Sequence, residues 1–188
     1  LREWQSERPH AGGKRPITGM VARQFMREKR YAEALELYRI ATRSVPEYTS
    51  WHLEYVYFTL VCRQKLAGQL TEEEQAAALK EIRQGEFLLR RGFSTTGLTE
   101  RYVGRLHQLR GEWAEAIPYL NASRTKLGGF DRVAADQALF LSLLHTGRKS
   151  EARALAENGV AQSGRYAPLY RQMLDALERK SAETPVEE

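Results

Sequence analysis

The sequence predicts an all-α protein of about nine helices, and three of its features support that prediction. Apolar residues recur at three- and four-residue spacing along most of the chain, which is the period of amphipathic helices. No run of five residues alternates between apolar and polar side chains, as a half-buried strand does. β-branched residues are scarce, and only 6 prolines interrupt the 188 residues.

The composition is that of a compact, basic protein. Hydrophobic residues make up 42% of the chain, which is too many for a disordered protein, and the formal net charge is +5. The longest apolar stretch, Tyr55–Cys62, is interrupted by Thr59 and is far shorter than the ~20 residues of a membrane-spanning helix. We therefore expect no membrane span. The single cysteine, Cys62, excludes an internal disulfide and a cysteine-rich zinc site.

Residues 1–14 are expected to form an N-terminal arm or linker. Pro9 and Pro16 bracket a basic, glycine-rich run, Gly12–Arg15. The opening residues lack the apolar core of a signal peptide, which favours a cytoplasmic location. The chain begins with Leu1, so a piece of a larger periplasmic or membrane-associated protein is the alternative, and the compartment stays open.

Residues 15–48 are expected to form a first pair of helices. Each helix has its apolar positions on one face: Val21, Phe25 and Met26 on the first, and Ala34, Leu37, Tyr38 and Ala41 on the second. Pro46 follows and ends the second helix, because proline cannot continue the hydrogen-bond ladder.

Residues 49–96 are expected to hold two longer helices joined by a longer turn, residues 66–71. The first has an apolar stripe that consists of Trp51, Tyr55, Phe58 and Cys62. The second starts well at Thr71, whose side chain suits a helix N-cap. Three acids, Glu72–Glu74, follow at the positive end of the helix dipole, which explains them without a metal site.

Three segments share one pattern: a turn, a long or aromatic residue, a small residue, Glu, Ala and then a longer side chain. They are residues 29–41, 111–120 and 147–156. Each follows a predicted helix, so the pattern indicates a repeated helix–turn–helix. The spacing is uneven, because Ala34 and Ala116 are 82 residues apart and Ala116 and Ala152 are 36 apart.

These segments resemble the tetratricopeptide repeat, a helix–turn–helix of about 34 residues. The first unit carries the resemblance best, through Ala22, Phe25, Tyr31, Ala34, Tyr38, Ala41 and Pro46. The resemblance implies a right-handed α-α superhelix of about four hairpins over residues 15–180: 15–48, an irregular 49–96, 97–130 and 131–164. A capping helix, 165–180, and an acidic disordered tail, 181–188, complete the expected order.

No constellation for catalysis is visible in the sequence. The histidines are scattered without ligand spacing: His10, His52, His107 and His145. Cys62 lies on an apolar stripe and is expected to be a buried, inert thiol. Residues 146–150 superficially resemble a phosphate-binding loop, but the upstream glycine and strand are lacking, which favours a helix–helix turn. We expect a protein that is not an enzyme, with no catalytic residue, cofactor or metal.

The expected binding residues are mainly basic. In the family that the chain resembles, the first helix of each hairpin lines the inner surface, which places Arg23 and Arg27 there in the first unit and Arg101 and Arg105 in the third. Like charges four residues apart repel and weaken a helix slightly. The two interpretations of these pairs are a solvated face and a basic groove for an acidic peptide.

Leu53 and Tyr57 are expected to join this groove from the irregular second unit. The alternative for the aromatic residues of this helix is a central helix enclosed by its neighbours, with its rings in the core.

The sequence favours a non-catalytic protein–protein interaction scaffold that binds a peptide or protein segment of acidic character in a concave groove. One alternative is a repeat domain of a larger bacterial envelope, polysaccharide-secretion or glycosyltransferase protein. Another is a basic helical-repeat module that binds RNA, which the interleaving of acids with the bases disfavours. The ends of a superhelix also offer a route to a homo-oligomer.

Overall fold

A computed structural model describes residues 17–47, 49–92 and 96–182. Over these residues the chain forms nine α-helices and one 3₁₀-helix, and they contain no strand. The prediction of an all-α fold is therefore confirmed for the described part of the chain. The expected arm lies outside the described residues, as do residues 183–188 of the expected tail. The chain divides into two compact units, Leu1–Ser94 (unit 1) and Thr95–Glu188 (unit 2).

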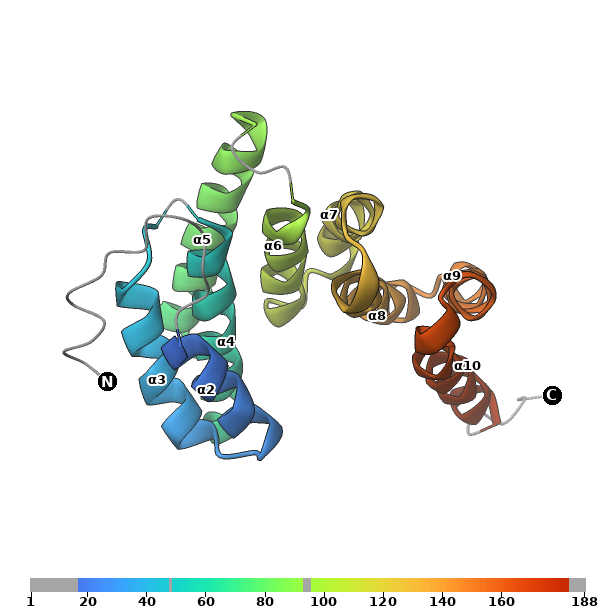
Figure 1. Cartoon of the computed structure of the whole chain (residues 1–188), viewed down its shortest axis with the longest axis horizontal. Coiled ribbons are helices and arrows are strands. Elements are labelled where there is room, and N and C mark those ends of the chain that lie inside the picture. Colours follow the sequence, from blue (N-terminus) through green and yellow to red (C-terminus); the bar gives the residue numbers. More distant parts are fainter. Residues whose placement is uncertain (1–16, 48, 93–95, 183–188) are drawn as a thin grey trace. The chain divides into compact units, whose positions relative to one another are not determined.

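Unit 1 contains four described helices that pack in chain order. They are α2 (Ile17–Arg27), α3 (Tyr31–Arg43), α4 (Ser50–Ala67) and α5 (Glu72–Arg90). Helix α2 packs on α3, α3 on α4 and α4 on α5 (Figure 1). Helices α4 and α5 have 18 and 19 residues, so the two longer helices predicted from the sequence are present.

The core of unit 1 combines small residues, which let helices approach, with aromatic rings that fill the space between them. Its fully buried members are Ala22, Ala34, Tyr38, Ala41, Tyr55 and Cys62. The rings of Tyr38 and Tyr55 have centres 6.1 Å apart, and Phe58 stacks on Tyr38 at 5.2 Å. The apolar faces predicted for these helices therefore meet in one cluster.

Helix α5 begins with a complete capping box. The hydroxyl oxygen of Thr71 accepts a 3.2 Å hydrogen bond from the backbone N–H of Glu74, and the Glu74 carboxylate accepts one of 3.0 Å from the backbone N–H of Thr71. The two contacts satisfy donors that a helix start leaves open. The helix start predicted at this position is confirmed.

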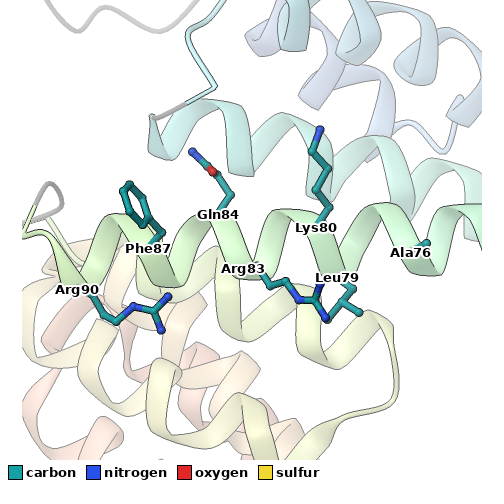
Figure 2. A pocket seen from close by; sticks show the side chains of 7 residues that line it. All are labelled: Ala76, Leu79, Lys80, Arg83, Gln84, Phe87 and Arg90. Carbon is teal, nitrogen blue, oxygen red and sulfur yellow. The ribbon is translucent and has the colours of Figure 1, made fainter.

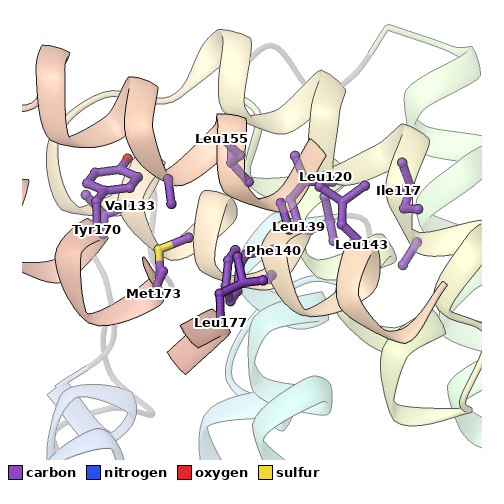
Figure 3. Close-up of a cluster of buried hydrophobic side chains, with 14 residues drawn as sticks. Ile117, Leu120, Val133, Leu139, Phe140, Leu143, Leu155, Tyr170, Met173 and Leu177 are labelled. Atoms are coloured by element: carbon purple, nitrogen blue, oxygen red, sulfur yellow. The ribbon is translucent and has the colours of Figure 1, made fainter. Parts of the chain in front are cut away.

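Unit 2 contains five α-helices and a short 3₁₀-helix among the described residues. They are α6 (Leu98–Leu109), α7 (Trp113–Lys126), α8 (Gly129–His145), α9 (Lys149–Gln162), η1 (Gly164–Tyr166) and α10 (Ala167–Ala182). Each α-helix packs on the next along the chain. One apolar cluster, drawn in Figure 3, runs from α7 through α8 and α9 to α10. Its α10 members are Tyr170, Met173 and Leu177.

Two glycines of unit 2 stand where another helix comes too close for any side chain. A Cβ on Gly104 of α6 would lie 2.8 Å from Cγ of Leu120 on α7. A Cβ on Gly159 of α9 would lie 2.0 Å from Cδ1 of Tyr170 on α10. The space that a side chain would need at each glycine is therefore filled by a larger side chain of the neighbouring helix.

One helix–helix turn recurs three times with the same backbone geometry. Lys29, Gly111 and Gly147 have positive φ angles of 60°, 79° and 75°. The next residue in each turn donates its backbone N–H to the carbonyl five residues earlier, in the pairs Arg30–Phe25, Glu112–His107 and Arg148–Leu143. This is the hydrogen bond of a Schellman helix end. The three segments that share a sequence pattern thus share a turn.

Buried carboxylates of unit 1 each meet a nitrogen from another helix. Nη2 of Arg23 on α2 lies 2.5 Å from Oε1 of Glu54 on α4. Nε2 of His52 on α4 lies 3.3 Å from Oε2 of Glu81 on α5. Both acids are buried, and the Arg23 guanidinium offsets the loss of hydration of Glu54. Oε2 of Glu81 makes no hydrogen bond with a described residue.

Unit 2 follows the same rule. The ammonium of Lys126 on α7 pairs with the buried carboxylate of Glu100 on α6. The buried Asp136 on α8 accepts two hydrogen bonds of 2.6 Å, one from Nε of Arg124 on α7 and one from the hydroxyl of Tyr170 on α10. Polar contacts thus join neighbouring helices through the core.

Candidate interaction surface on helix α5

The expected binding residues of unit 1 differ in accessibility. The Arg23 guanidinium is engaged by Glu54, whereas Arg27, one turn further along α2, is exposed. Leu53 is fully buried, and Tyr57 is 5% exposed. Leu53 and Tyr57 therefore lie in the core, as expected for a helix that its neighbours enclose, and not on an exposed groove wall.

The expected binding residues of unit 2 lie on α6. Arg101 is 4% exposed, and its guanidinium donates to Oδ1 of Asp131 at 2.7 Å and to the hydroxyl of Tyr102 at 2.9 Å. The contact with Asp131 holds the start of α8 against α6, so Arg101 has a structural role. Arg105 is half-buried. The six expected residues are divided between the two units, and neither unit contains them all.

Two histidines of unit 2 make packing contacts. Nδ1 of His107 lies 2.8 Å from the Glu112 carboxylate, and its ring stacks on Tyr119 with centres 5.4 Å apart. The exposed His145 stacks on Trp113 at 3.8 Å. His10 lies outside the described residues.

Cys62 has no exposed surface, and burial raises the pKa of its thiol to about 11. A thiol with that pKa carries little thiolate near neutral pH. In the described ranges, His, Cys, Asp and Glu side chains form no group of three placed to hold a metal ion. None of the helices in those ranges has the length and apolarity needed to cross a bilayer.

The outward face of α5 is a surface that the sequence analysis does not single out. The helix packs on α4 and buries one side, which consists of Ala78, Glu81, Ile82, Gly85 and Leu88. Five other residues follow one another at alternating steps of four and three. They are Ala76, Lys80, Arg83, Phe87 and Arg90, which we call the α5 stripe. Steps of three and four keep them on one side of a helix with 3.6 residues per turn.

The α5 stripe borders a surface hollow of about 590 Å³, to which Leu79 and Gln84 also contribute (Figure 2). In Figure 2, Lys80 and Phe87 project to one edge of the helix and Arg83 and Arg90 to the other. Positive charge therefore lies along both edges of the face.

The charges of the α5 stripe are available to a partner. Lys80, Arg83 and Arg90 are exposed, and no described residue forms an ion pair with any of them. Phe87 is 44% exposed, and the Arg91 guanidinium lies 5.5 Å from the centre of its ring. The stripe thus places three cations beside a partly exposed aromatic ring, a combination suited to carboxylates and apolar side chains.

A second hollow, of about 230 Å³, lies in unit 2 and is bordered by residues of α7, α8 and α9. Its charged residues are Arg124 and Glu151, which are of opposite sign. Both already have partners, because Arg124 donates to Asp136 and Glu151 accepts from Arg148. This hollow therefore offers no charge selectivity, and the α5 stripe is the stronger candidate.

The sequence does carry a signal for the α5 stripe. Positions 76, 80, 83, 87 and 90 have helical spacing, but three of them are basic, so a search for apolar periodicity follows the buried side of α5 instead.

Comparisons with protein-family models, with curated proteins and with solved structures found no match for this chain.

Proposed function

We propose that the chain is a non-catalytic protein–protein interaction scaffold that binds an acidic segment of a partner protein on the α5 stripe. The observation that carries the proposal is the cluster of Lys80, Arg83 and Arg90 beside the exposed Phe87. Arginine and lysine give charge-assisted hydrogen bonds to carboxylates, and a central aromatic residue supplies apolar contact. By contrast, Arg23 and Arg101 are already engaged within the fold, Arg23 by the buried Glu54 and Arg101 by Asp131.

RNA is the less favoured partner for this surface. Phe87 is the single aromatic residue of the stripe, whereas single-stranded nucleic acids are bound by successive stacking platforms.

The hairpins themselves are proposed to be tetratricopeptide-type units stacked as a right-handed superhelix. The recurrent turn at Lys29, Gly111 and Gly147 supports this proposal. The close approach of α6 and α7 at Gly104 supports it as well, since small residues between paired helices belong to such repeats.

The test is a charge reversal on the stripe of the full chain. The variant Lys80→Glu with Arg83→Glu is compared with Arg153→Glu, which reverses an exposed, unpaired base on α9. The probes are two labelled synthetic peptides that share the same leucines, one rich in glutamate and one rich in lysine. Binding is followed by fluorescence anisotropy, with single-stranded RNA as a third probe.

The acidic peptide is expected to bind wild type, and the double reversal should weaken it roughly tenfold or more. Arg153→Glu should leave its affinity within about twofold of wild type, and added salt should weaken binding. Equal binding of the acidic and basic peptides, or an unchanged affinity in the double variant, would contradict the proposal. Tighter binding of RNA, lost in the double variant, would assign the surface to nucleic acid instead.

A further inference from the structure

We infer that the acidic segment binds as an amphipathic α-helix laid alongside α5. This inference rests on the proposed function and adds the form of the partner. It starts from the spacing of the stripe, whose five members alternate in steps of four and three along 15 residues of an uninterrupted helix. The same spacing forms the contact seam between two paired helices.

The distances along the stripe fit helical repeats in a partner. Arg83 and Arg90 are two turns apart, which is about 10.5 Å along the axis at 1.5 Å per residue. Acids seven residues apart on a partner helix have the same separation. In an extended segment, side chains on one face recur every ~6.6–6.8 Å, so successive acids fall out of step with these bases.

The apolar members of the stripe fit the same arrangement. Ala76 is small and leaves room for a large side chain of a partner, and Phe87, seven residues beyond Lys80, supplies a ring to pack against. The aliphatic stems of Lys80 and Arg83 lie between them and cover apolar surface while their charged groups reach outward. Leucines at seam positions and glutamates beside them therefore describe the partner helix.

A second copy of this chain does not fit the stripe. In a parallel pair of α5 helices, each base of one copy would face the same base of the other. In an antiparallel pair whose stripes overlap fully, Arg83 of one helix would face Arg83 of the other. Like charges at such contacts oppose association, so a helix of opposite charge is favoured over self-pairing.

Two synthetic peptides of 21 residues test the inference with the full chain. Peptide H has leucines at alternating steps of three and four, with glutamate and alanine elsewhere. Peptide P is the same sequence with prolines at two central positions, which prevents a continuous helix. Affinities are measured for wild type, Phe87→Ser, Lys80→Glu with Arg83→Glu, and the matched control Arg153→Glu. Circular dichroism follows the helix content of peptide H.

Peptide H is expected to bind at least tenfold more tightly than peptide P and to gain helix content on binding. Phe87→Ser and the double charge reversal should each weaken peptide H roughly tenfold, and Arg153→Glu should not. Thermal unfolding followed by circular dichroism checks that the variants keep their fold.

The results separate this inference from the proposed function. Equal affinities for H and P, both lost in the double reversal, would overturn the helical form of the partner and leave the acidic-segment site in place. Affinities for H and P that the double reversal does not change would overturn both. Insensitivity of peptide H to Phe87→Ser would show a purely electrostatic contact and would also overturn the helical seam.

Discussion

Nη2 of Arg23 on α2 lies 2.5 Å from Oε1 of Glu54 on α4, and this contact ties the first described helix of unit 1 to the third. Glu54 is 1% exposed. Its charge is therefore removed from water and depends on the guanidinium for compensation. Arg23 thus has a structural role that any mutation of this residue will reveal.

Replacing Arg23 by glutamine should lower the free energy of unfolding by about 2–3 kcal/mol, because the buried Glu54 loses its charged partner. The measurement is urea unfolding followed by circular dichroism. Arg27→Gln on the exposed side of the same helix is the control and should change the free energy by no more than about 0.5 kcal/mol. Equal effects of the two substitutions would show that the ion pair contributes nothing.

Replacing Lys29 by glycine should stabilise unit 1. Lys29 has a φ of 60°, a conformation that costs a residue with a side chain about 1–2 kcal/mol, and the matching turns carry Gly111 and Gly147. Glycine also has more conformational freedom in the unfolded chain, which offsets part of this stabilisation. The expected net increase in the free energy of unfolding is therefore about 0.5–1 kcal/mol. In the reciprocal change, Gly111→Lys, the added Cβ has no atom within 4 Å, and the positive φ alone should cost about 1 kcal/mol. A loss of stability in Lys29→Gly would contradict the turn geometry.

The Tyr170 hydroxyl should make stability fall at alkaline pH. Burial, together with the hydrogen bond to Asp136, raises the pKa of Tyr170 from 10.0 to about 12. Between these values the unfolded chain loses the proton while the folded chain keeps it, so the free energy of unfolding decreases as pH rises from 10 to 12. Below pH 10 this contribution is fully present.

Tyr170→Phe separates the hydroxyl from the ring. It should cost about 1–2 kcal/mol below pH 10, through the lost hydrogen bond, and should show a smaller alkaline decrease than wild type. Urea unfolding over the two pH ranges measures both effects. The same alkaline slope in wild type and variant would assign the effect to other groups.

Replacing Gly159 by alanine sets two effects of opposite sign against each other. Alanine favours a helix over glycine by about 1 kcal/mol. The added Cβ would lie 2.0 Å from the Tyr170 ring, and such overpacking costs about 1–3 kcal/mol or more. We expect the clash to dominate and the melting temperature to fall. Gly128→Ala, with no atom within 4 Å of the added Cβ, is the control and should cost at most about 1 kcal/mol.

The helices could be predicted from the sequence because their signals are local. The Thr71 cap needs only the next three residues, and the recurrent turns show as a shared pattern around Lys29, Gly111 and Gly147. A hydrophobic period within one segment is enough to place a helix and choose its buried side.

The proposed binding surface could not be predicted in the same way, because the role of an arginine depends on acids far away in the chain. Arg23 meets Glu54 across 31 positions, and Arg101 meets Asp131 across 30. No local pattern distinguishes these paired arginines from exposed ones such as Arg27 and Arg83. Only the packed helices separate structural cations from those available to a partner.

The buried acids also bear on how this chain can be rearranged. Glu54 and Asp136 are each paired with a base from the preceding expected hairpin, Arg23 for Glu54 and Arg124 for Asp136. A hairpin moved to another place in the chain would bring its acid to a neighbour that lacks the matching base. The hairpins therefore share a turn geometry but differ in the bases that pair with their acids. Engineering by deletion, duplication or shuffling must move each of these acids together with its base.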